Sequence, residues 1–383
     1  MGGAKAAVLE RFNAPLQLRD FPVPVKLDPG AALVRTEMAG ICGTDVHLWK
    51  GQLPISLPVI LGHETVGRIE LLGAGLERDW NGQPLKPGDR VTWNSATSCG
   101  QCHYCAEKNQ PTRCPNRRAY GIGYRCDQPP HLLGGYAQYH YLHPGTTLHK
   151  LPDDLTTESV IGAGCALITA IHGVERMCVE TRGEPMSQAM PRLPGLWNDS
   201  AIIQGAGPVG IAALAVVKAA GVRQAIVVGG PKKRLELATR FGADATIDID
   251  DATDPRDRIL AARKLTGGDG ADVVLECVGI PSAVPEGLEM CRDGGKYLVL
   301  GHYCNAGEVG LSPHVVTRKQ LQVFGSWSSE PRHLWMALEF LRTTRRQFPF
   351  DAMVSHRFPL DQASPALATT ATWQSAKSVL LPN

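Results

Sequence analysis

The sequence predicts a protein of α/β class with two domains, a mainly β domain first and a doubly wound parallel sheet after it. Residues 1 to about 150 form short apolar runs separated by Gly and Pro turns, which is typical of β structure. After Ser200, continuous β-branched runs alternate with helical stretches, which indicates a parallel sheet covered on both faces. The length of 383 residues also exceeds what one hydrophobic core usually serves.

Composition excludes several classes of protein. Hydrophobic content of 43% and charged content of 20% are those of an ordinary globular chain. A formal charge of +2 gives no reason to expect a nucleic-acid or membrane partner. We find no signal-like apolar run at the start and expect no later window of membrane-spanning length, so we predict a cytoplasmic protein.

In the first domain, strands are expected at residues 31–36, 65–72 and 89–93. A helical stretch follows Thr157 and carries Cys165 and His172. Residues 176–199 contain three prolines and are expected to form a long loop.

The second domain should contain six strands in an alternating series with helices. The expected strands are residues 201–203, 225–228, 245–247, 272–275, 297–300 and 321–324. Helices are expected at 208–220 and 231–241, and a later one at 333–341. This series fits a doubly wound nucleotide-binding fold. The tail at 378–381 is expected to return to the first domain.

A glycine loop joins the first strand of this series to its helix. The loop reads Gly205-Ala206-Gly207-Pro208-Val209-Gly210. Its tight turn directs backbone N–H groups and the helix N-terminus towards a pyrophosphate, so the strand–helix context predicts a dinucleotide cofactor.

The choice between NAD and NADP stays open. The second strand ends at Gly229 without the usual acid, and the cation Arg234 follows on the helix together with Lys232 and Lys233. Leu300 and Gly301 end the fifth strand, where a doubly wound sheet holds its ligand. We expect Gly229, Arg234, Leu300 and Gly301 to lie at the cofactor.

Eleven cysteines are present, and four of them are bunched. Cys99, Cys102, Cys105 and Cys114 have the spacing C-x2-C-x2-C-x8-C, which predicts a closed structural zinc site. An iron–sulfur cluster also uses four thiolates, but nothing else in the sequence points to electron transfer. A zinc ribbon that binds nucleic acid is disfavoured by the near-neutral charge.

A second metal site is indicated by the stretch from Gly40 to His47 read with Gly62-His63-Glu64. Cys42 and His63 offer a thiolate and an imidazole, a donor pair that suits zinc better than magnesium or calcium. Two side chains do not complete a site.

Over almost its whole length the chain resembles the zinc-dependent medium-chain alcohol dehydrogenases. The motifs that carry the resemblance, in order, are Gly40 to His47, Gly62 to Glu64, Lys86 to Val91, the four cysteines, Gly164-Cys165, the glycine loop and Arg234 to Asp244. The resemblance implies a GroES-like catalytic domain at 1–170 and 325–383 with both zinc sites, and a Rossmann domain at 171–324.

The resemblance also implies roles for single residues. Cys165 would be the third ligand of a catalytic zinc held by Cys42 and His63. Glu64 would be a carboxylate that transiently replaces a ligand, and Asp45 would hold the imidazole of His63.

Two further residues of the first motif would carry the proton. Thr44 would pass the alcohol proton to the nicotinamide ribose and His47 would release it. Two departures from the family are the last cysteine spacing, eight instead of seven, and the longer segment at 176–199.

The implied activity is hydride transfer between a primary or secondary alcohol and NAD(P), giving an aldehyde or ketone. An alternative is a polyol or amino-alcohol dehydrogenase of the same fold, although Cys165 leans away from the polyol branch. A remote alternative is a zinc-stabilised binding protein without catalysis. The family suggests a homodimer or homotetramer.

Overall fold

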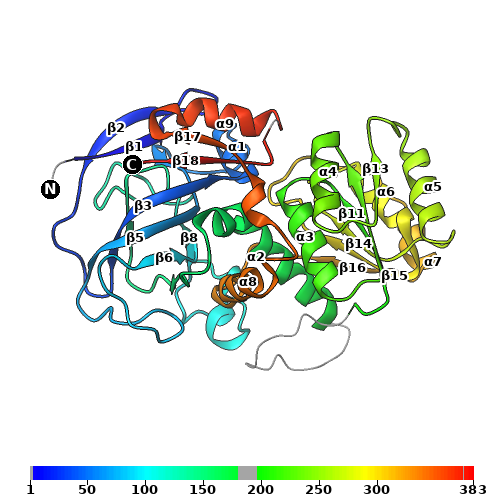
Figure 1. Cartoon of the computed structure of the whole chain (residues 1–383), viewed down its shortest axis with the longest axis horizontal. Helices are drawn as coiled ribbons and strands as arrows, with labels where there is room; N and C mark the ends of the chain where they lie inside the picture. The colour runs from blue at the N-terminus through cyan, green and yellow to red at the C-terminus, as the bar shows by residue number, and fades with distance from the viewer. Residues whose placement is uncertain (1–2, 180–195, 374) are drawn as a thin grey trace. The chain divides into compact units, whose positions relative to one another are not determined.

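The computed structural model describes residues 3–179, 196–373 and 375–383, and the chain divides into two compact units (Figure 1). Unit 1 contains residues 1–164, 330–342 and 350–383. Unit 2 contains residues 165–329 and 343–349. The last segment of the chain therefore belongs to the same unit as the first.

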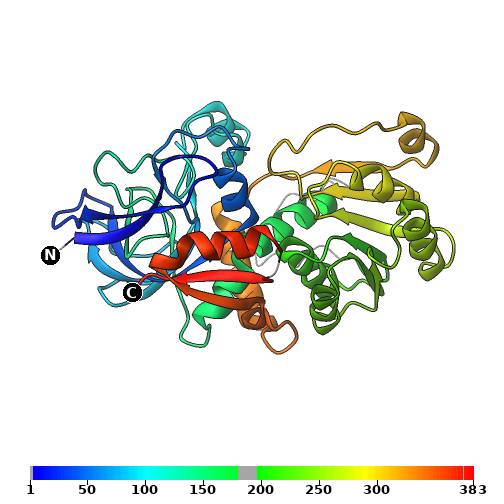
Figure 2. The ribbon, with the colours of Figure 1, turned by 90° about the horizontal axis from the view of Figure 1, so that it is seen from above.

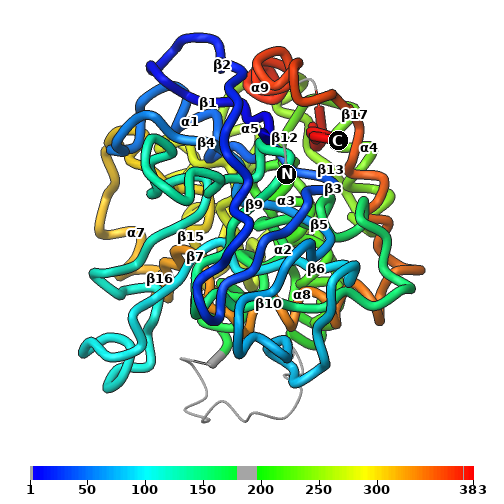
Figure 3. Tube along the Cα trace, turned by 90° about the vertical axis from the view of Figure 1, so that its left-hand side faces the viewer, coloured from blue at the N-terminus to red at the C-terminus, as the bar shows by residue number. Residues whose placement is uncertain are grey.

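Unit 1 is mainly β, as predicted. Its largest sheet has the order β10-β6-β5-β3-β18-β17, with β9 paired to β3, and its strands can be followed in Figure 3. A second sheet has the order β2-β1-β4, and β7 pairs with β8. The strands are β1 Gly3–Leu9, β2 Gln17–Pro22, β3 Ala32–Ile41, β4 Val59–Ile60, β5 Glu64–Leu72, β6 Arg90–Trp93, β7 Ala96–Thr97, β8 Arg118–Ala119, β9 Tyr139–Leu142, β10 Leu148–Lys150, β17 Val354–Pro359 and β18 Lys377–Leu381.

The C-terminal strand β18 closes this unit. It pairs antiparallel with β3, so that Ser378 lies opposite Ile41 and Leu380 opposite Ala39. Helix α9 (Ala363–Ala371) contacts β18, and both are seen beside the N-terminal strands in Figure 2. The predicted return of the tail is confirmed.

Short helices complete unit 1. They are α1 Gly43–Trp49, the π-helix η1 His103–Glu107 and the 3₁₀ helices η2 Pro111–Arg113, η3 Phe350–Met353 and η4 Leu360–Gln362. Helix α8 (Pro331–Thr344) lies at the predicted position and buries its apolar side.

Unit 2 is the predicted doubly wound sheet. Its six parallel strands have the order β13-β12-β11-β14-β15-β16. The strands are β11 Ser200–Gln204, β12 Gln224–Gly229, β13 Ala245–Asp248, β14 Ala271–Glu276, β15 Cys291–Val299 and β16 Gln322–Gly325. The helices are α3 Pro208–Ala219, α4 Lys232–Arg240, α5 Pro255–Leu265, α6 Ala283–Met290 and α7 Pro313–Arg318.

The strand order of unit 2 reverses at β11, whose neighbours are β12 and β14. Helices α3 and α4 pack together, and α6 packs against both α5 and α7. Ligands of such sheets bind at the carboxyl ends of the strands, beside the point of reversal.

Helix α2 (Thr157–Val179) is kinked at Gly164, whose φ of 48° and ψ of −149° are not helical. The helix includes 176–179, so the expected loop begins later than predicted; the rest of that loop, 180–195, lies outside the described residues. Contrary to our expectation, α2 is long and apolar enough to cross a membrane. Its apolar window is 61% buried inside the protein, which is the behaviour of a core helix.

Candidate active site

Cys42 lies between strand β3 and helix α1, where its backbone caps the helix. The carboxylate of Asp45 accepts a hydrogen bond from the backbone N–H of Cys42 through Oδ2 at 2.8 Å. Its other oxygen, Oδ1, lies 3.3 Å from Nδ1 of His63. Asp45 is fully buried, so one carboxylate fixes both the thiol-bearing backbone and the imidazole.

The imidazole of His63 is held in a charged surrounding. Burial lowers its pKa, but the negative charge of Asp45 and the hydrogen bonds that the ring donates to the side chains of Asp45 and Cys42 outweigh burial and raise the pKa well above 6.5. A metal ion needs the neutral imidazole and the deprotonated thiol, so metal binding here releases protons.

Four potential ligand atoms converge at this point. One atom each from Cys42, His63, Glu64 and Cys165 all lie within 4.8 Å of one another. Gly164 makes the convergence sterically possible, because a Cβ at this left-handed position would lie 2.4 Å from Oε1 of Glu64. The kink of α2 therefore lets Cys165 follow directly beside the carboxylate.

This donor set fits zinc. Two thiolates and one imidazole are soft-to-borderline donors of the kind found in catalytic zinc sites, which keep the fourth position open. The carboxylate of Glu64 is a fourth group within reach, so this chain places an internal competitor for the open position at the site.

Thr44 and His47 lie on α1, three residues apart and therefore on one side of the helix. Both are partly exposed. Nδ1 of His47 lies 2.5 Å from Oε1 of Gln52, which orients the ring. Both residues therefore follow the candidate ligand Cys42 closely in sequence, on a helix whose first turn is fixed by the hydrogen bond from Cys42 to Asp45.

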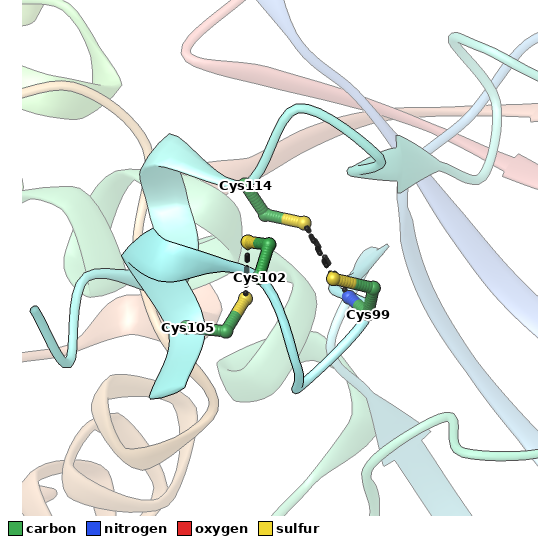
Figure 4. A group of neighbouring side chains, drawn as sticks. All are labelled: Cys99, Cys102, Cys105 and Cys114. Carbon is green, nitrogen blue, oxygen red and sulfur yellow. Dashed lines mark hydrogen bonds between the residues drawn. The ribbon is translucent and has the colours of Figure 1, made fainter. Parts of the chain in front are cut away.

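The four clustered cysteines form a second metal-ligand group (Figure 4). The sulfur atoms of Cys102 and Cys105 lie 3.5 Å apart, and so do those of Cys99 and Cys114. Sulfurs around a tetrahedral zinc ion, with bonds of about 2.3 Å, are separated by roughly 3.8 Å. The thiols are therefore nearly at their metal-bound spacing.

The backbone prepares this group for metal binding. N–H groups of Gln101 and Cys102 lower the pKa of the Cys99 thiol to about 6. Desolvation and the neighbouring Cys102 raise the pKa of Cys105. The backbone thus favours the thiolate of Cys99, and a bound cation would favour ionisation of the other thiols.

The glycine loop of unit 2 has the geometry expected of a pyrophosphate site. Gly207 caps helix α3, and Pro208 occupies its first turn. A Cβ at Gly210 would lie 1.8 Å from the carbonyl oxygen of Gly205, so no other residue fits there. A Cβ at Gly229 would lie 2.8 Å from Ala206 N, which places the end of β12 against the loop. The guanidinium of Arg234 lies on the same side, near Gly207.

Leu300 and Gly301 follow β15 and are held by Glu276, a residue that the sequence reasoning missed. The carbonyl of Glu276 accepts from the N–H groups of Leu300 and Gly301 at 2.9 and 3.0 Å. Its fully buried carboxylate accepts from Val278 and Gly279 at 2.7 and 2.6 Å. The signal was an acid that ends an otherwise apolar strand.

A second missed residue is Asp248. It lies directly opposite Gly229 in the parallel pairing of β12 and β13. Its Oδ1 would be 3.8 Å from a Cβ at Gly230. The carboxylate that the end of β12 lacks is thus present on the neighbouring strand, and only the strand register reveals it.

Comparisons with known proteins agree with this arrangement. Residues 28–153 match the family described as alcohol dehydrogenase GroES-like domain, and residues 208–343 match the zinc-binding dehydrogenase family. Among curated relatives, 5-exo-hydroxycamphor dehydrogenase of Pseudomonas putida is 33% identical over 98% of both chains. D-arabinitol dehydrogenase 1 of Uromyces fabae is 28% identical over 93% of this chain and 91% of its own.

Solved structures give the same result. An alcohol dehydrogenase from Thermotoga maritima matches with a TM-score of 0.89 and 33% identity over 100% of both chains. A zinc-binding dehydrogenase from Sinorhizobium meliloti, bound to NADP, matches with a TM-score of 0.82 and 26% identity, again over 100% of both chains.

The chain belongs to the zinc-dependent medium-chain alcohol dehydrogenase family. Its α/β architecture of a GroES-like domain and a Rossmann domain is confirmed. It is an oxidoreductase that transfers hydride between an alcohol and NAD(P), and zinc and NAD(P) are its cofactors. The activity rules out the alternative of a zinc-stabilised binding protein without catalysis.

Proposed function

We propose that Cys42, His63 and Cys165 hold the catalytic zinc and that Cys99, Cys102, Cys105 and Cys114 hold a structural one. The observation that carries the proposal is the convergence of ligand atoms from Cys42, His63 and Cys165, which lie far apart in sequence, within 4.8 Å. When bound there, zinc supplies the Lewis acidity that polarises the alcohol oxygen.

The side chains around this site would manage the proton. Thr44 accepts the alcohol proton at its hydroxyl oxygen and donates its own proton towards the cofactor ribose. His47, which is half-buried and bonded to Gln52, passes a proton to solvent. Asp45 lies at Nδ1 of His63, which leaves Nε2 as the nitrogen that would be available to a metal ion.

For the substrate, we favour a bulky apolar secondary alcohol over a polyol. Tyr303 and Trp327 stack with ring centroids 5.3 Å apart and planes inclined by 3°, and Trp327 Nε1 donates to the Tyr303 carbonyl. They follow the carboxyl ends of β15 and β16, where the sheet binds its ligands. The similarity to 5-exo-hydroxycamphor dehydrogenase supports the same class.

For the cofactor, we favour NAD. Asp248 ends β13 directly opposite Gly229 at the end of β12, where its carboxylate would accept a hydrogen bond from an adenosine ribose and repel a 2′-phosphate. Lys232 and Lys233 are exposed on α4 and would favour NADP, but exposed charges are screened. The half-buried acid should therefore dominate.

We further propose a homodimer or homotetramer in the cytoplasm. Val323, on the edge strand β16, is 50% exposed and offers apolar surface to a second copy. Light scattering after size-exclusion chromatography measures the assembly.

The test of the site is a matched pair of variants. Cys42→Ala should reduce turnover of a cyclic secondary alcohol by at least about a thousandfold and leave NAD binding unchanged. Cys126→Ala removes a buried thiol of unit 1 outside both metal-ligand groups and should keep turnover. Near-normal activity of Cys42→Ala would overturn the assignment. A panel that includes polyols, monitored with both cofactors, tests the substrate class.

A further inference from the structure

A buried ion pair joins the C-terminal strand to the candidate metal site. Nζ of Lys377, the first residue of β18, donates to Oε2 of Glu64 at 2.5 Å. The two side chains are 2% and 1% exposed. Removing an ammonium group from water is costly unless the charge is paired, so the ion pair with Glu64 offsets the desolvation of Lys377.

Gly40 and Gly164 leave the space that this ion pair occupies. A Cβ at Gly164 would lie 2.4 Å from Oε1 of Glu64 and 3.0 Å from Nζ of Lys377. A Cβ at Gly40 would lie 2.5 Å from Oε2 and 3.2 Å from Cε of Lys377. The carboxylate is thus confined between two glycines, the lysine and the metal-ligand group.

Glu64 therefore stands between two positive charges once a metal ion is bound. One of its oxygens belongs to the group formed with Cys42, His63 and Cys165. Without the lysine, nothing on this side would oppose the attraction of the metal for the carboxylate, and a fourth protein ligand would close the position that a catalytic zinc site keeps open.

We propose that Lys377 is a positioning residue that holds the carboxylate of Glu64 away from the catalytic metal and so keeps the substrate position open. The inference rests on the proposed metal site. Lys377 lies more than three hundred positions from Glu64 in sequence. Its role leaves Cys42, His63 and Cys165 as the metal ligands.

The test compares neutral and charged residues at position 377 by metal release. Lys377→Gln loses the charge, and Lys377→Arg keeps it. Zinc release from the purified holoenzyme to a chromogenic chelator is followed in two phases, and the ion of the four cysteines is the internal control. In Lys377→Gln the ion at Cys42 should leave roughly 10- to 100-fold more slowly, because a fourth ligand holds it. Lys377→Arg should release it at the wild-type rate.

A second background separates positioning from loss of fold. The double variant Lys377→Gln with Glu64→Gln removes both buried charges and should lose the slow release. The cobalt-substituted proteins give a signature independent of turnover, since the visible spectrum of Lys377→Gln should change and that of the double variant should return towards wild type.

The outcomes distinguish this inference from the proposed function. The role of Lys377 alone would be overturned if the wild-type chain held two ions and Lys377→Gln released the ion at Cys42 as fast as wild type or faster, both with Glu64 and with Glu64→Gln. A wild-type chain that holds one ion, at the four cysteines, would overturn the metal site itself and this inference with it.

Discussion

Two buried histidines should make the folded protein sensitive to mild acid. His140 and His149 are fully buried in unit 1. Within the described part of the chain neither ring has a hydrogen-bond partner, and His140 packs edge-on against Trp93 and Tyr120. Burial lowers the pKa of His140 to about 3 and that of His149 to about 4.

The sign and size of the effect follow from these shifts. Both folded-state pKa values lie below the ordinary 6.5, so the unfolded chain binds more protons in acid. The stabilisation is complete above pH 6.5 and is lost as the pH falls towards the folded-state values. At pH 5 each histidine should cost about 2 kcal/mol, at 1.36 kcal/mol per pH unit. The loss of about 4 kcal/mol for the two histidines is a large part of a typical free energy of unfolding of about 5–15 kcal/mol.

The assay is urea unfolding between pH 7.5 and 5. His149→Leu should flatten the pH dependence of the free energy of unfolding by about 2 kcal/mol relative to wild type. His314→Leu, at an exposed position of unit 2, is the control. Metal loss in acid affects all variants alike, so the difference between His149→Leu and wild type reports the protonation of His149 alone. Parallel curves for wild type and His149→Leu would refute the reasoning.

Three further predictions concern the cofactors. Cys114→Ser should lose one zinc per chain by elemental analysis and lower the melting temperature by on the order of 5 °C or more; an unchanged zinc content would exclude the structural site. Gly210→Ala, whose Cβ would lie 1.8 Å from the carbonyl of Gly205, should weaken NAD binding at least about tenfold in a fluorescence titration while zinc stays bound. Asp248→Asn should reduce the preference for NAD over NADP in kcat/KM by about tenfold, whereas Asp251→Asn, at an exposed position, should not; equal ratios in all three proteins would remove Asp248 from the cofactor site.

The features that could be predicted from sequence are those set by local pattern. The six strands of unit 2 were readable because parallel strands form continuous apolar runs, and the glycine loop because its steric requirements lie within six residues. The four cysteines lie within one short segment and converge in the structure for the same reason.

The features that could not be predicted depend on contacts distant in sequence. Lys377 reaches Glu64 only because β18 adds to the sheet beside β3. Asp248 comes to the end of β12 only through the register of β13. The sequence on both sides of Gly164 has a helical pattern, so the hydrophobic periodicity does not predict the kink. The contact of Asp45 with His63 was expected from the family resemblance, whereas the hydrogen bond that the other oxygen of Asp45 accepts from the Cys42 backbone appears only in the structure.

The central claim is that Cys42, His63 and Cys165 hold a zinc ion separate from the one at the four cysteines. Elemental analysis of the purified wild-type chain and of Cys42→Ala tests it most directly. We predict two zinc ions per wild-type chain and one in Cys42→Ala, with the melting behaviour of the four-cysteine loop unchanged. One zinc in the wild type, or two in Cys42→Ala, would contradict the claim.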